Sequence, residues 1–258
     1  MKELLDKIPF PGDKPDEWQA ATLPPEYHGI TAKPGEAWFV DGGNAAILEA
    51  PHFSLQKLRA IAVHYPDKIV KQREGYCLIT RTDSGWLLEG DSRDTSQGEL
   101  QDAITFARQQ LEHSVAKECS GLVVLDGDIA PAGTIALQKS ITILTKNHFP
   151  LSSVLTKPGP WYAKLGKVFA VKLDSRARHV FLVRNASPEQ LSVLAGYSGD
   201  ALFPGYPQGL VLADRLARVS KEEAESLRIQ AKSKMKALKQ LRQAEASTDS
   251  HSILDSMG

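Results

Sequence analysis

The chain contains AWFVDGG at residues 37–43 and GLVVLDGD at residues 121–128, two apolar stretches that each run into Asp-Gly. Four or five apolar residues followed by turn-forming residues are typical of a buried central strand. Asp-Gly is also a common turn dipeptide, so one copy alone would carry little information. Because both copies close a similar strand, we expect Asp41 and Asp126 to form a carboxylate pair that holds a divalent cation.

The composition indicates an ordinary soluble globular protein. The 258 residues suffice for one large domain or two small ones, with 42% hydrophobic and 24% charged residues and a net charge of zero. Cys77 and Cys119 have no metal-binding spacing, which fits a reducing cytoplasm. No apolar run approaches the roughly 18 residues of a membrane helix, and residues 1–10 lack the apolar core of a signal peptide. We therefore expect a cytoplasmic location and no membrane.

The segments after Asp41 predict an antiparallel meander. Residues 42–44 (Gly-Gly-Asn) predict a turn that leads back into a strand at 45–49. Residues 58–64 and 76–82 predict further strands, the last followed by a hairpin turn into 86–88.

Residues 97–116 then change to helical spacing, because apolar residues recur along one helix face. Glu99 borders this face on a row that leans towards the sheet, whereas Glu112 lies further round beside Arg108. A Glu on a helix is most often a solvated surface residue. The spacing favours Glu99 as a functional carboxylate, with Glu112 as the alternative. The face comprises Leu100, Ala103, Ile104, Ala107, Leu111 and Val115.

The order of these elements is a strand with Asp, several strands, a helix with Glu, and a strand with Asp. This is the order of a ribonuclease H-like α/β fold, a mixed sheet with flanking helices in which three carboxylates converge at one end of the sheet. Close carboxylates need cations between them, and the associated chemistry is metal-assisted phosphodiester hydrolysis. Many α/β proteins share such an order, so the chemistry depends on the site itself.

The second half of the chain adds basic and acidic candidates. Lys139 follows Asp126 by 13 residues and could reach a phosphate as a point charge, although most lysines are surface residues. Asp214 could complete the metal site or form a helix-end ion pair with Arg215 or Arg218. Residues 157–184 interleave seven basic residues with Trp161 and Tyr162. That segment is either a phosphate-tracking groove with base-stacking aromatics or a solvated sheet edge.

We predict four parts along the chain. Residues 1–36 form a Pro-rich N-terminal arm with a short helix at its start, and residues 37–218 form the α/β domain. Residues 219–245 form a C-terminal helix with an apolar stripe and a basic surface, suited to docking or dimerisation. Residues 246–258 form a polar, disordered tail.

Four stretches together resemble the NurA family of archaeal and bacterial DNA-end nucleases. They are FVDGG at 39–43, VLDG at 124–127, Lys139-Ser140 followed by Leu144-Thr145, and Gly205-Tyr206-Pro207 running to Ala213-Asp214. They occur in the family's order. The family has His where this chain has Asp214, a change that keeps a ligand for hard cations but removes the imidazole.

The resemblance implies a ribonuclease H-like core and a manganese- or magnesium-dependent DNA nuclease, with 5′–3′ exonuclease and endonuclease activity. It also implies a ring-shaped homodimer that acts on single- or double-stranded DNA ends with a HerA-type hexameric ATPase, in the end resection of DNA repair. The implied metal ligands are Asp41, Glu99, Asp126 and Asp214. Lys139 would stabilise charge on the phosphate, and Tyr206 would position the substrate or the attacking water.

Two other functions remain open at this point. One is a non-catalytic DNA-clamp subunit of such an ATPase complex, suggested by the Asp at position 214. The other is a small-molecule phosphohydrolase that uses the same carboxylates.

Overall fold

The structure is a computed structural model that describes residues 26–91, 93–127, 129–139, 155, 157–165 and 167–234. It divides into two compact units. The first contains the described residues up to Phe39, residues 64–69 and residues 120–211. The second contains residues 40–63, residues 70–119 and the described residues from Leu212 onwards.

The first unit contains a mixed sheet. Its hydrogen-bonded strand order, starting at the edge, is β1 (Tyr27–Gly29), β9 (Trp161–Leu165), β10 (Val168–Lys172), β11 (Phe181–Arg184), β8 (Ile135–Gln138) and β7 (Val123–Asp126). Strands β7 and β8 are parallel, and the pairs from β8 to β1 are antiparallel. The first residues of β2 (Ala37–Ala50) follow β7, where the Trp38 N–H donates to the Leu122 carbonyl at 2.8 Å. Helix α5 (Pro188–Gly196) also belongs to this unit.

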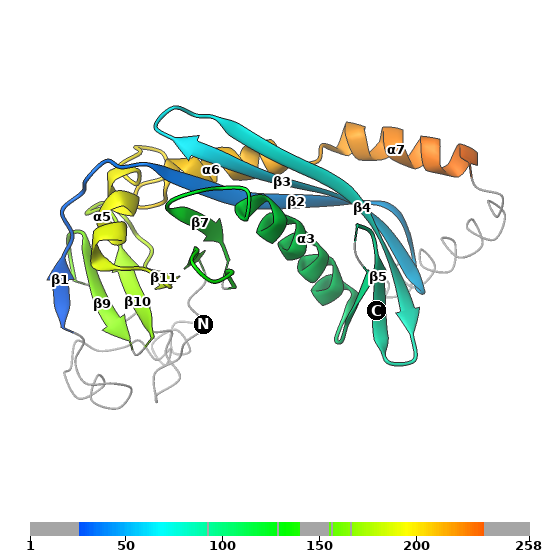
Figure 1. Ribbon diagram of the computed structural model, residues 1–258, viewed down its shortest axis with the longest axis horizontal. Coiled ribbons are helices and arrows are strands. Elements are labelled where there is room, and N and C mark those ends of the chain that lie inside the picture. The colour runs from blue at the N-terminus through cyan, green and yellow to red at the C-terminus, as the bar shows by residue number, and fades with distance from the viewer. Residues whose placement is uncertain are drawn as a thin grey trace, which may run out of the picture. The chain divides into compact units, whose positions relative to one another are not determined.

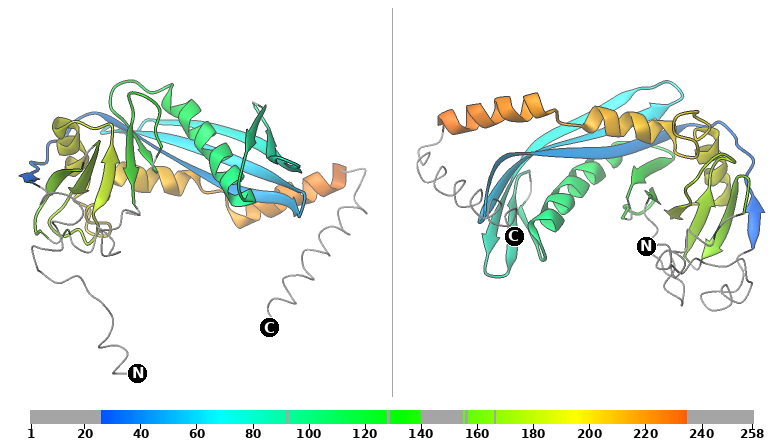
Figure 2. Two further views of the ribbon diagram at one scale, coloured as in Figure 1. Left: turned by 90° about the horizontal axis from the view of Figure 1, so that it is seen from below. Right: turned by 180° about the vertical axis from the view of Figure 1, so that it is seen from behind.

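The second unit contains the rest of β2, followed in order by β3 (Phe53–Tyr65), β4 (Val70–Thr82), β5 (Gly85–Glu89) and β6 (Arg93–Ser96). Helix α3 (Leu100–Ala116) covers one face of this sheet, and α7 (Lys221–Lys234) lies on the other (Figures 1 and 2). Leu227 and Ala231 of α7 contact the cluster around Ile47 and Leu48. Helix α6 (Gln208–Ala217) begins in the first unit and ends in the second.

The strand order around β2 confirms the predicted ribonuclease H-like α/β fold. Outward from β2, the second unit places β3 and then β4, whereas the first unit places β7 and then the parallel strand β8. Helix α3 comes between the antiparallel strands and β7 in the sequence, as predicted. In the described part of the chain, no helix has both the length and the apolar character needed to cross a membrane.

The turn predicted at residues 42–44 is wrong, because β2 continues without interruption to Ala50. Gly42 and Gly43 instead allow close approach by neighbouring elements. A Cβ at Gly42 would lie 2.4 Å from Glu112 Oε1, and one at Gly43 would lie 2.3 Å from the Ala217 carbonyl oxygen. Asp41 therefore lies inside a long strand rather than at the end of a short one.

Other boundaries also differ from the predictions. The predicted N-terminal arm contains a strand, β1, that pairs with β9. The predicted helix near the N-terminus, the last part of the C-terminal helix and the tail at 246–258 lie outside the described residues. The division into residues 1–36, 37–218 and 219–245 stays a prediction.

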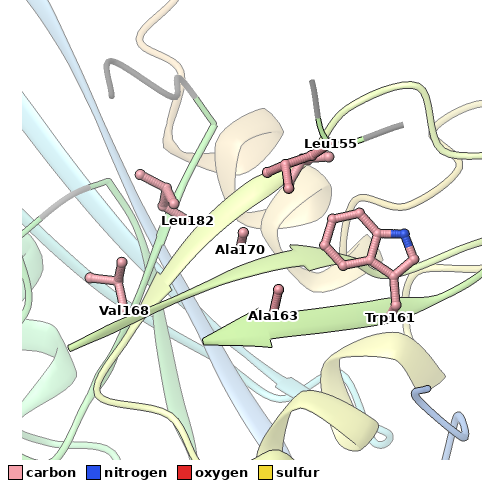
Figure 3. Close-up of a cluster of buried hydrophobic side chains, with 7 residues drawn as sticks. Leu155, Trp161, Ala163, Val168, Ala170 and Leu182 are labelled. Atoms are coloured by element: carbon pink, nitrogen blue, oxygen red, sulfur yellow. The ribbon is translucent and has the colours of Figure 1, made fainter. Parts of the chain in front are cut away.

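Buried side chains on one face of β9, β10 and β11 form a core cluster in the first unit (Figure 3). Trp161 is its largest member; the indole is 1% exposed and donates its N–H to the Lys157 carbonyl at 2.7 Å. The Tyr27 ring meets it edge-on at 4.7 Å. Such burial stabilises the unit and removes Trp161 from any role in base stacking. The other members are Leu155, Ala163, Val168, Ala170, Val180 and Leu182.

We predict that Gly209→Ala destabilises the protein. In a helix the change would by itself be favourable by about 1 kcal/mol. Here a Cβ would lie 2.0 Å from Phe39 Cδ2, and the Phe39 ring is fully buried between Tyr65 and Tyr197. Overpacking of this kind costs roughly 1–3 kcal/mol and outweighs the helix term.

Urea unfolding measures the change, with Gly29→Ala as the matched control, because a Cβ at Gly29 meets nothing within 4 Å. A Gly209→Ala protein as stable as the wild type would contradict the packing of α6 on β2.

Candidate functional site

Two buried carboxylates meet at one guanidinium group in the second unit. Asp41 on β2 is 3% exposed, and Glu112 on α3 is 2% exposed. Arg108, one helical turn before Glu112, places its Nη1 2.8 Å from Glu112 Oε1 and 3.8 Å from Asp41 Oδ1. Asp41 Oδ1 also accepts the backbone N–H of Gly42 at 2.8 Å. The side chains of β2 and α3 thus hold two acidic groups close together away from solvent.

Gly42 makes this arrangement possible. The Glu112 carboxylate and the Arg108 side chain lie directly over the Gly42 backbone, where a Cβ would come within 2.4 Å of Glu112 Oε1 and 3.0 Å of Arg108 Cγ. The Gly42 carbonyl accepts a hydrogen bond from Arg108 Nη1 at 3.2 Å. The Gly that follows Asp41 therefore serves helix–strand contact, because any side chain there would push Glu112 away.

Glu99 is not on the helix face that the apolar spacing predicted. Helix α3 begins at Leu100, so Glu99 is the N-cap residue, with extended backbone and an exposed side chain. Its backbone N–H donates to the Asp102 carboxylate at 2.9 Å. The structure instead brings Glu112, the alternative, to Asp41. A residue just before a helix does not follow the helical row, which is why spacing alone misplaced Glu99.

The first unit brings together three of the predicted residues. Lys139, just after β8, places its Nζ 2.6 Å from Asp126 Oδ2 at the end of β7. The same Nζ lies 4.6 Å from the centre of the Tyr206 ring, a cation–π distance. Tyr206 also contacts Phe181 of β11 at 5.9 Å. Asp126 ends β7 and Lys139 follows β8, its parallel neighbour. Tyr206 contacts Lys139 from a loop that is distant in the sequence.

The Gly-Tyr-Pro loop owes its position to Gly205. This residue has a φ of 89°, which favours glycine, and a Cβ would lie 2.3 Å from the Ala177 Cβ. Its N–H donates to the Ser198 carbonyl at 2.7 Å. The tight loop thereby fixes the backbone position of Tyr206, whose ring lies next to Lys139.

Asp214 adopts the ion pair that the sequence left as an alternative role. On α6 its Oδ2 lies 2.6 Å from Arg218 Nη2, one helical turn later. The two side chains are 40% and 73% exposed, and such surface pairs contribute little to stability. Asp41 and Glu112 belong to the second unit and Asp126 to the first, so a joint site of these carboxylates stays a prediction.

The donor chemistry suits a hard divalent cation. Carboxylate oxygens at Asp41, Glu112 and Asp126 are of the type that Mg²⁺ and Mn²⁺ prefer. Within the described residues, no group of three or more His, Cys, Asp or Glu side chains is arranged to hold a metal ion. The carboxylates instead contact Arg108 in one unit and Lys139 in the other.

A cavity of about 700 Å³ in the second unit lies apart from these carboxylates. Its wall includes Cys77 of β4 and His113 of α3, and neither Asp41 nor Glu112 lines it. Burial raises the pKa of the Cys77 thiol above its ordinary value, so the thiol stays neutral near pH 7. The cavity therefore offers no activated thiol nucleophile.

A row of aromatic rings crosses three strands at the edge of the first unit's sheet. His28 of β1 stacks on Tyr162 of β9 with ring centres 4.9 Å apart, and Tyr162 meets Phe169 of β10 edge-on at 5.5 Å. All three are partly exposed, and strand register places the exposed Lys164 opposite Phe169 on the same face. The sequence identified Tyr162 but missed His28 and Phe169, because their proximity depends on strand pairing.

Comparison with known proteins supports the assigned fold but does not show the chemistry of the site. No protein-family model matches the sequence, and no curated protein matches it. Among solved structures, the NurA nuclease from Sulfolobus solfataricus is similar with a TM-score of 0.52 and 15% identity, over 85% of this chain and 88% of that one. A NurA structure with manganese has a TM-score of 0.51 and 9% identity, over 92% and 96% of the two chains.

The fold is thus of the ribonuclease H-like class found in nucleases. More specifically, the chain has a NurA-like fold, as the sequence resemblance predicted.

We predict that Gly42→Ala destabilises the protein by roughly 1–3 kcal/mol, because its Cβ would clash with the Glu112 carboxylate. Gly75→Ala is the control, since a Cβ there has only the Asp91 carboxylate within 4 Å, at 3.9 Å. Shortening Glu112 to Ala in the Gly42→Ala background should restore part of the loss, with a coupling above about 0.5 kcal/mol in a double-mutant cycle. Additive effects in urea unfolding would show that the two positions do not touch.

Proposed function

We propose that the protein is a metal-dependent DNA nuclease. The observation that carries the proposal is the pair of buried carboxylates, Asp41 and Glu112, held against the central strand of a NurA-like fold. Burying two acidic side chains together is costly without nearby cations, and clusters of buried ionisable groups are characteristic of functional sites. A role in stability alone would be better served by apolar residues.

In this proposal Asp41, Glu112 and Asp126 supply the metal ligands, with Glu112 taking the role that the sequence gave to Glu99. Asp214, which pairs with Arg218 at 2.6 Å, would act as a further ligand only after release from that pair. The metal would be Mn²⁺ or Mg²⁺.

When bound, the metal ion would activate a water molecule and neutralise charge on the phosphodiester. The Lys139 ammonium, held between Asp126 and the Tyr206 ring, is positioned to bind a phosphate oxygen. Tyr206 orients Lys139 through its ring face.

The aromatic row of the first unit supplies a contact surface for single-stranded DNA. A base could extend the His28–Tyr162 stack at the sheet edge, and Lys164 on the same face could contact the backbone phosphate. The segment 157–184 contains seven basic residues and one acidic residue, in a chain whose net charge is zero. This charge asymmetry favours a polyanionic partner.

The finer parts of the proposal rest on the family resemblance in the sequence. They are action on DNA ends with 5′–3′ exonuclease and endonuclease activity, a homodimeric ring, a HerA-type hexameric ATPase partner, a role in DNA repair and a cytoplasmic location.

We predict that Glu112→Gln lowers metal-dependent cleavage by roughly 100-fold or more, because a neutral amide is a poor ligand for a hard cation. Asp126→Asn should have a similar effect. Glu99→Gln, at the N-cap of the same helix, is the matched control and should stay within about twofold of the wild type, since Glu99 is exposed. The measurement is degradation of end-labelled linear single- and double-stranded DNA with Mn²⁺, Mg²⁺ or EDTA. An active Glu112→Gln enzyme, or an inactive Glu99→Gln enzyme, would overturn the reassignment.

A non-catalytic DNA clamp is the second candidate. It is favoured by the basic partner that each candidate carboxylate has within its own unit: Arg108 for Asp41 and Glu112, Lys139 for Asp126, and Arg218 for Asp214. Absence of cleavage in every metal, with intact DNA binding that weakens steeply with salt, would support the clamp.

We predict that Tyr162→Ala lowers the affinity for single-stranded DNA by about tenfold, because stacking of one base contributes roughly 1–3 kcal/mol. Fluorescence anisotropy with a labelled oligo-dT measures the dissociation constant at fixed salt. Tyr76→Ala in the second unit is the control, as Tyr76 is also an exposed tyrosine, at 49%. Equal affinities for the two variants would remove the aromatic row from the DNA surface.

A further inference from the structure

We propose that Arg108 occupies the position of a cation between Asp41 and Glu112, and that a divalent cation binds there by displacing the Arg108 side chain. The inference rests on the metal site proposed above. It adds that a side chain of the protein, Arg108, competes with the metal ion for that site.

Three oxygen atoms surround Arg108 Nη1. They are Glu112 Oε1 at 2.8 Å, the Gly42 carbonyl oxygen at 3.2 Å and Asp41 Oδ1 at 3.8 Å. Carboxylate and backbone carbonyl oxygens are also the ligands that hard divalent cations prefer. The guanidinium nitrogen therefore contacts oxygen atoms whose chemistry also suits a metal ion.

Guanidinium and metal cannot share this position. The three distances are those of hydrogen bonds and an ion pair, whereas Mg²⁺ holds its oxygen ligands at about 2.0–2.1 Å. A metal ion bound by the same oxygens would draw them towards the point that Nη1 occupies, and two cations would repel each other there. Binding of one excludes the other.

The Arg108 side chain is the partner able to leave. It is 27% exposed, whereas the Asp41 and Glu112 side chains are 4% and 2% exposed. Glu112 is confined by contact with the Gly42 backbone, and Arg108 is attached by a long stem with a path to solvent. The carboxylates thus remain buried and available to the metal while the guanidinium swings outwards.

This competition has two consequences. In the metal-free protein Arg108 screens the repulsion between two buried carboxylates, which stabilises the fold. When metal is present, the same interaction lowers the apparent affinity of the protein for the metal ion, because part of the binding free energy is used to displace Arg108.

The test is Mn²⁺ binding to the full chain without DNA, measured by isothermal titration calorimetry with MnCl₂. Arg108→Gln should bind Mn²⁺ about tenfold more tightly than the wild type. Its EDTA-treated form should melt at a lower temperature and gain more from added Mn²⁺. Arg93→Gln is the matched control, because the Arg93 side chain is 73% exposed and its ion pair with Glu89 is long, at 3.8 Å. The Mn²⁺ affinity of this variant should stay within about twofold of the wild type. Equal or weaker Mn²⁺ binding by Arg108→Gln would overturn the inference.

A second variant separates competition from general charge effects. In a Glu112→Gln background, the gain from Arg108→Gln should disappear, because the shared ligand is lost. A gain that persists there contradicts the inference. Should Arg108→Gln be unfolded without metal, recovery of the fold in MnCl₂ supports it, whereas an unfolded protein in saturating MnCl₂ shows a purely structural role and contradicts it.

The same titrations distinguish this inference from the proposed function. If the wild type binds Mn²⁺ and Arg108→Gln binds it with the same affinity, the metal site stands and only the role of Arg108 is overturned. Absence of Mn²⁺ binding in wild type and variant alike overturns both.

Discussion

The contact between the Glu112 carboxylate and the backbone of Gly42 constrains much of the second unit. It requires a residue without a side chain directly after Asp41, because a Cβ would lie 2.4 Å from Glu112 Oε1. Strand β2 continues past Asp41 to Ala50, so Gly42 lies within the strand and beneath Glu112. Arg108 then reaches both carboxylates and the Gly42 carbonyl from one turn earlier on the helix. The position of the acidic pair follows from this close approach of helix and strand.

Much of the fold was predictable because the chain's strongest patterns are local. Apolar runs predicted β3, β4, β7 and the first part of β2, and helical spacing predicted α3. Strands β3 and β4 begin several residues before their predicted starts, and β2 is one strand where two were predicted. The Gly-Gly-Asn segment at 42–44 misled the prediction, since glycine pairs serve equally for turns and for close packing. Here the glycines serve close packing, because α3 lies against Gly42 and the end of α6 lies against Gly43.

The candidate site was predictable in part. Asp41 and Asp126 were proposed from strand-ending motifs, Lys139 from its spacing after Asp126, and Tyr206 from the family resemblance. Asp126, Lys139 and Tyr206 meet in the first unit. The sequence favoured Glu99 over Glu112, whereas the structure places Glu99 at the exposed N-cap and Glu112 beside Arg108. The difference arises because the preference depended on where the helix begins, and helix ends are the least certain feature of a sequence pattern. His28 and Phe169 were missed because only strand register brings them beside Tyr162. Trp161, which looked like a stacking residue, is a core residue because alternation along β9 turns it to the buried face.

The central claim is that the buried carboxylates Asp41 and Glu112 bind a divalent cation. A crystal structure of the protein grown with MnCl₂, with an anomalous difference map recorded at the manganese edge, tests it most directly. We expect a manganese peak contacted by oxygens of Asp41 and Glu112, with Arg108 moved away from Glu112. A map without a peak at these carboxylates, with Arg108 still bound to Glu112, would contradict it.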